Sequence, residues 1–167
     1  MENKYYYLVA SLPYLEFDKP PLITKEQFLS ESGKWLTRSD YRKLSGIDIH
    51  DPYKQAGDPA VISKWKSFDR ELREELAEIR KEFRKSDSRG ETASFKDVFG
   101  QANPLFMEKK LERKKWDFLE GIEADYHFDI NELVIYFLKL QILERLASFD
   151  KEKGKEKFEI LCEVKYG

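Results

Sequence analysis

The segment at 130–149, INELVIYFLKLQILERLASF, is apolar on nearly every face of a helix. Such a helix must be surrounded by protein or by lipid. Its length of about 20 residues would suit a membrane span. Six polar or charged side chains argue against a span: Asn131, Glu132, Lys139, Gln141, Glu144 and Arg145. The segment therefore predicts a helix at the centre of a bundle.

A second long helix is predicted from the period of its apolar residues. It would begin at Asp58-Pro59, an N-cap residue followed by a proline suited to the first helical turn. Apolar residues then recur at intervals of three and four and form one stripe, and charged residues fill the other faces. The stripe comprises Val61, Trp65, Phe68, Leu72, Leu76, Ile79 and Phe83. We expect this helix, at about 59–85, to be exposed along one side.

The remaining helices are predicted from shorter signals. Tyr5–Leu12 fits a strand or a helix by composition, and a helix is favoured because no segment offers a convincing partner strand. Thr24 and Gln27 form a capping box at the start of a helix at about 24–37. Further helices are expected at Ser39–Leu44, from Pro104 to about Leu119, and near Lys151–Val164. These elements predict a single all-α domain over residues 1–167, a bundle of about six helices.

Charge and cysteine content limit the functional classes. Charged residues make up 37% of the chain, yet the net charge is only −2. A balanced chain has no general electrostatic reason to bind nucleic acid or an anionic membrane. The opening residues lack the basic start and cleavage site of a signal peptide, and Cys162 is the single cysteine. We expect a cytoplasmic protein that does not insert into a membrane.

No motif for catalysis is present. The sequence contains no phosphate-binding loop, dinucleotide fingerprint, HExxH or paired CxxC. We therefore expect no enzymatic activity, no metal and no cofactor. Two histidines lie among carboxylates: Asp48, His50 and Asp51, and then Asp125, His127 and Asp129. Imidazole with carboxylates can hold a divalent metal, so a small metal- or ligand-binding bundle is the alternative function. Both groups fall in predicted loops, where caps and turns are the simpler interpretation.

A cationic run at 109–115 suggests phosphate binding at first sight. Acids lie at i,i+3 or i,i+4 from most of its cations, as in Glu112–Lys115 and Arg113–Asp117. Only Lys110 lacks such a partner. An ion-paired, solvated helix face is therefore favoured over nucleic-acid contact.

An acidic stretch is the least ordinary charge feature. From Trp116 to Leu138 there are six acids and no lysine or arginine. The segment at 120–129, EGIEADYHFD, is predicted to connect two helices, and connections often carry binding residues. The candidate partner-binding residues are Asp117, Glu120, Glu123, Asp125 and Asp129. The alternative is a solvated loop in which Asp129 caps the following helix.

Two stretches carry a family resemblance. They are YYYLVASLP at Tyr5–Pro13, and WDFL with the later FD and LKLQILER within Trp116–Phe158. Together they resemble a family of short bacterial proteins of unknown function that is associated with V/A-type ATPases. That family is itself similar to a divergent form of the d-type subunit of those ATPases.

The resemblance implies a non-catalytic role. The d-type subunit is an all-helical adaptor that seats the central shaft on the proteolipid ring and transmits torque without hydrolysing ATP. The implied partners are other subunits of the ATPase, and the implied location is peripheral to the inner membrane through the complex. The usual d-type subunit is a considerably longer chain of repeated bundles, so no contact residue can be carried over.

Overall fold

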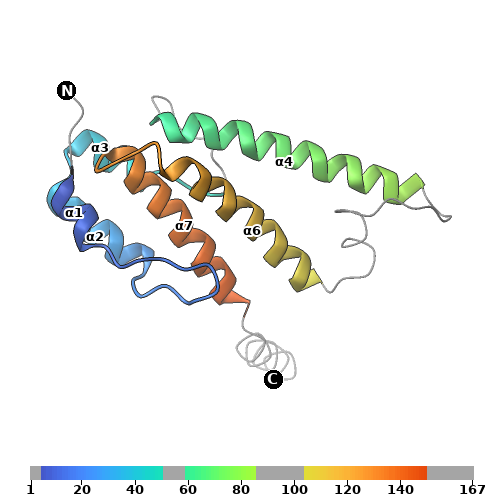
Figure 1. Ribbon diagram of the computed structural model, residues 1–167, viewed down its shortest axis with the longest axis horizontal. Helices are drawn as coiled ribbons and strands as arrows, with labels where there is room; N and C mark the ends of the chain where they lie inside the picture. Colours follow the sequence, from blue (N-terminus) through green and yellow to red (C-terminus); the bar gives the residue numbers. More distant parts are fainter. Residues whose placement is uncertain (1–4, 51–58, 86–103, 150–167) are drawn as a thin grey trace, which may run out of the picture.

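The structure, a computed structural model, describes residues 5–50, 59–85 and 104–149. Across these ranges it contains six helices and no strand, which confirms the all-α prediction. The helices are α1 (Tyr6–Ser11), α2 (Lys25–Trp35), α3 (Arg38–Ser45), α4 (Ala60–Lys85), α6 (Pro104–Glu123) and α7 (Ile130–Ser148). Figure 1 shows α7 in the middle, with α1 and α2 on one side of it and α6 and α4 on the other.

The apolar segment forms the centre of the bundle, as predicted. α7 contacts α2, α3, α4 and α6. Phe137 of α7 is buried and stacks on Phe28 of α2, with 5.3 Å between the ring centroids. The helix begins at Asp129, whose side chain accepts a hydrogen bond from the Glu132 backbone N–H at 3.0 Å. In the ranges that the structure describes, no helix is both long enough and apolar enough to cross a bilayer.

The first three helices follow local sequence signals. α1 is a helix and not a strand, although only Leu8 within it is buried. Thr24 and Gln27 make both hydrogen bonds of the predicted capping box at the start of α2. Thr37 caps α3, and the helix ends at Gly46. α2 contacts both α1 and α3, and α2 and α3 each pack on α7.

The long amphipathic helix is confirmed as α4, which has one buried stripe. Trp65 is fully buried, and Phe68 is partly buried and stacks on Phe118 of α6 with ring centroids 4.1 Å apart. The other buried members of the stripe are Val61, Leu72, Leu76 and Ile79. Asp58 and the Phe83 side chain lie outside the described residues, and the predicted helix at 151–164 with Cys162 does so too.

α6 is longer than the sequence indicates. The pattern predicts that the connection begins at Glu120, but the helix continues through Gly121 to Glu123. A glycine within a helix costs about 1 kcal/mol relative to alanine. Trp116 and Leu119 are buried and Ile122 packs against the core, so their burial outweighs that cost. A Cβ at Gly121 would meet no atom within 4 Å, so the glycine is not required by packing.

Replacing Trp65 by alanine is expected to lower the free energy of unfolding by about 3–5 kcal/mol, because the side chain is fully buried between α4 and α6. Chemical denaturation measures this change. Glu74→Ala, on the exposed side of α4, is the matched control and should change stability by less than about 0.5 kcal/mol. Equal, small losses in both variants would contradict the assignment of Trp65 to the core.

Candidate functional site

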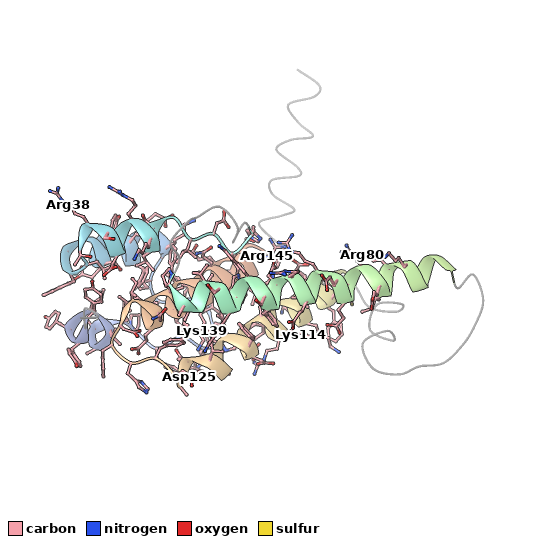
Figure 2. The ribbon with its side chains drawn as sticks, turned by 90° about the horizontal axis from the view of Figure 1, so that it is seen from above. Arg38, Arg80, Lys114, Asp125, Lys139 and Arg145 are labelled. Atoms are coloured by element: carbon pink, nitrogen blue, oxygen red, sulfur yellow. The ribbon has the colours of Figure 1, made fainter. Side chains whose placement is uncertain are left out.

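The predicted acidic residues gather where α6 ends and α7 begins. Asp117 and Glu120 are exposed on the last turns of α6, and Glu123 is its last residue. Asp125 lies in the connection and points outward at this end of the bundle (Figure 2). Asp129 is buried as the N-cap of α7, with 5% of its surface exposed. Four of the five candidates are therefore accessible to a partner, and Asp129 has a structural role.

The fold supplies cations that the acidic stretch itself does not contain. Asp117 pairs with Arg113 at 2.9 Å along α6. Asp125 pairs with Lys64 of α4 at 3.3 Å, and this pair is exposed. Exposed pairs contribute little to stability, but they reduce the net charge of the cluster. Glu120 is exposed and pairs with no cation within the described part of the chain.

Glu123 is part of a more buried pair. Its carboxylate accepts a hydrogen bond from Lys139 Nζ at 2.7 Å. Lys139 belongs to α7 and is only 5% exposed, and its ammonium also lies 5.0 Å from the centroid of the Trp116 ring. Removing the Glu123 charge would leave a buried ammonium without its counter-ion, which is strongly destabilising. Glu123 therefore supports the fold as well as the acidic surface.

Beside the acids lies a group of exposed aromatic rings, which we call the aromatic face: Tyr6, Tyr7, Trp35 and Phe128. Their exposed fractions range from 37% to 67%. Tyr6 contacts Phe128 with ring centroids 4.7 Å apart, and Tyr7 contacts Trp35 at 4.5 Å. Because Tyr6 and Tyr7 are consecutive on α1, this helix joins the two pairs. The sequence identifies α1 as a packed helix but does not indicate that its tyrosines face outward.

The backbone at Phe128 is held in an unusual conformation. Its φ is 59°, in the left-handed region that residues with side chains seldom adopt. The Tyr5 N–H donates to the Phe128 carbonyl, and the Phe128 N–H donates to the Glu132 carboxylate. Such a conformation costs about 1–3 kcal/mol, and strained residues of this kind cluster at functional sites. Here it presents an aromatic ring at the surface next to Tyr6.

The two histidines are not brought into a metal-binding arrangement by the described residues. The His50 N–H donates to the Asp48 carboxylate at 2.8 Å in a local turn. The His50 ring lies 3.5 Å from the Arg145 guanidinium, and a neighbouring cation disfavours a metal. His127 is exposed in the connection. Across 5–50, 59–85 and 104–149, no three potential ligands come together.

The cationic run on α6 is largely ion-paired. Arg113 and Lys115 pair along the helix with Asp117 and Glu112, as the spacing indicates. Lys114 instead reaches Glu75 of α4 at 2.5 Å. Lys110, for which the sequence offers no acid, lies 4.9 Å from the centroid of the Phe106 ring. The predicted ion pairing is present, but the prediction of a solvated face is wrong for the Lys115–Glu112 pair, because Glu112 is fully buried and Lys115 is largely so.

A family model described as "Protein of unknown function (DUF2764)" matches residues 1–51 and 71–166. The chain belongs to the DUF2764 family. Comparisons with curated proteins and with solved structures gave no match. All four rings of the aromatic face and all five acidic candidates lie within the matched ranges. The DUF2764 match thus covers the candidate site without assigning it a role.

The structural role of Asp129 can be separated from binding. Asp129→Ala should lower the free energy of unfolding by about 1 kcal/mol, because the Glu132 N–H loses its acceptor. Asp129→Asn keeps an acceptor oxygen at the same place and is the matched control, with stability close to the wild type. Chemical denaturation distinguishes the two. An equal loss in both variants would mean that the charge of Asp129, and not its cap, stabilises α7.

Proposed function

We propose that this chain is a non-catalytic subunit or accessory of a V/A-type rotary ATPase, an adaptor of the d-type kind between central shaft and membrane ring. The observation that carries a docking role is the aromatic face, in which two exposed ring pairs are held side by side on α1. Exposed apolar groups gathered in one place are typical of interaction sites. Tyrosine and tryptophan are also the residues that most often dominate binding energy.

The assignment to a rotary ATPase rests on the sequence resemblance. The two stretches that carry it, Tyr5–Pro13 and Trp116–Phe158, contribute three of the four rings of the aromatic face. They lie far apart in the sequence and meet where the Tyr5 N–H bonds to the Phe128 carbonyl. The resembling residues therefore build one surface, and that surface is the candidate docking site.

A docking role agrees with the remaining features of the chain. The sequence has no nucleotide-binding motif, so torque transmission or assembly is a better proposal than hydrolysis. Attachment to the membrane would be indirect, through the proteolipid ring or the shaft. The protein would then act at the cytoplasmic side as a peripheral component of the complex.

The aromatic face is tested by co-purification of ATPase subunits with the tagged chain from its native host. Tyr7→Ala with Trp35→Ala removes one ring pair and should weaken the association by at least about 2 kcal/mol, as loss of aromatic anchors does. Quantitative mass spectrometry of the purified complex measures the loss.

The control is Phe106→Ala, which removes a similarly exposed ring near the start of α6, away from the aromatic face. It should leave co-purification unchanged. Retention of ATPase subunits by the Tyr7/Trp35 double variant would overturn the docking site, and absence of these subunits from the wild-type sample would overturn the ATPase assignment itself.

The accessible acids should act on the rate of association. Glu120→Gln with Asp125→Asn removes two charges and should slow assembly at low salt and flatten its salt dependence, because charge steers encounter. Glu123 and Asp129 stay unchanged, since each supports the fold. Stopped-flow or surface-binding kinetics measure the rate.

Glu71→Gln with Glu74→Gln on the exposed side of α4 is the matched control, with the same change of net charge. Its association rate should stay close to that of the wild type. A Glu120/Asp125 variant that associates as fast as this control at low salt would show that the acidic connection is only a solvated loop.

A further inference from the structure

A cavity of about 200 Å³ lies beside the aromatic face, between the segment that follows α1 and the first turns of α7. Its walls include the apolar side chains of Val9, Leu12 and Leu133 and the rings of Tyr14 and Tyr136. An apolar cavity of about 150 Å³ is large enough to take up benzene. This cavity therefore has room for one long side chain.

The rim and the wall of the cavity differ in exposure. Tyr14 is 81% exposed, so its ring stands at the entrance. Tyr136 is anchored, because its hydroxyl donates to the Pro13 carbonyl at 2.8 Å. Burial raises the pKa of Tyr136 above its ordinary value of 10.0, and its phenol is uncharged at neutral pH with or without that shift. The cavity thus combines an anchored, uncharged tyrosine in its wall with an exposed aromatic side chain at its mouth.

Three charged side chains also line the cavity: Glu123, Glu132 and Lys139. The Lys139 ammonium is matched by Glu123, at 2.7 Å. Glu132 accepts a hydrogen bond from the Phe128 N–H, which is an uncharged donor. The negative charge of Glu132 is therefore not neutralised by that bond, and the cavity lining carries an excess of one negative charge.

We propose that this cavity receives the side chain of a lysine or arginine from the docked protein partner. The methylene stem would lie against the apolar walls while the cationic group reaches Glu132. The tyrosine rings offer further attraction to the cation. The inference rests on the proposed docking function and names the chemistry of the partner segment, which is a basic residue beside an apolar patch.

An anionic group fits this cavity less well. To bind Lys139 it would have to displace Glu123, and it would then lie near two carboxylates. Figure 2 shows that Lys139 lies within the bundle, whereas Asp125 points outward. The ammonium thus acts as an internal counter-ion. The Phe128–Glu132 hydrogen bond also links the cavity to the aromatic face, so one partner segment can cover both.

The test uses the full chain and three capped tripeptides, in which alanines flank arginine, norleucine or glutamate. NMR follows the methyl groups of Val9, Leu12 and Leu133 during each titration. The arginine peptide should shift these signals saturably, and the norleucine and glutamate peptides should bind at least about tenfold more weakly. Glu132→Gln keeps an acceptor for the Phe128 N–H and should weaken arginine binding about tenfold or more, as loss of a charged hydrogen bond does.

Glu74→Gln removes the same charge from the exposed side of α4, outside the cavity lining, and is the matched control, with arginine binding expected within about twofold of the wild type. Any of four results would overturn the proposal. The norleucine peptide could bind as tightly as the arginine peptide, or the glutamate peptide could bind more tightly. The arginine peptide could cause no saturable shift, or the Glu132→Gln variant could bind it as tightly as the wild type does. Denaturation midpoints verify that both variants are folded. This test contains no ATPase component. A negative result would therefore reject the cavity proposal and leave the ATPase assignment to be decided by co-purification.

Discussion

The arrangement of the molecule depends on how the polar side chains of α7 are satisfied. A helix packed on all sides leaves its polar groups without water, and each must find a partner inside the protein. Five polar residues of α7 bond to other parts of the bundle. Asn131 accepts from the Val61 N–H of α4, and Glu144 accepts from the Lys25 N–H of α2. Gln141 bonds to Ile47 and Ile49 after α3, while Lys139 and Arg145 pair with Glu123 and Glu108 of α6. These five are among the six residues that argue against a membrane span in the sequence, and they connect α7 to the rest of the bundle.

α1 is held in a different way, and this explains the exposed aromatic face. It is short and contributes Leu8 to the core, and the preceding Tyr5 donates its hydroxyl to Asp40 of α3 at 2.5 Å. No polar residue of α7 in the described ranges bonds to a side chain of α1. A six-residue helix cannot turn every apolar side chain inward, so Tyr6 and Tyr7 stay outside. A partner could contact these rings because they are exposed and not packed in the core.

Local signals in the sequence predict most of the helices. Long-range contacts determine two features that those signals do not predict, the end of α6 and the cationic partner of Asp125. The stripe of α4 and the capping box at Thr24 each depend on residues a few positions apart, and both are confirmed. The predicted end of α6 is wrong because burial of Trp116 and Leu119 outweighs the local effect of Gly121. The sequence does not reveal the cation beside Asp125, because Lys64, which pairs with it, is distant along the chain.

These ion pairs reduce the negative charge that the candidate site can present to a partner. Of the five predicted acids, Asp117, Glu123 and Asp125 have cationic partners and Asp129 is occupied as a cap. Charges beyond about 8 Å are screened at physiological salt, so the remaining field is short in range and modest in strength. It can orient a basic partner on approach, but it cannot hold one. In the proposed complex the aromatic face would lose water from its exposed rings on contact and would act only once the partner has arrived. The proposal therefore gives the two kinds of side chain separate tasks: the acids around the connection would affect how fast the complex forms, and the rings would affect how long it lasts.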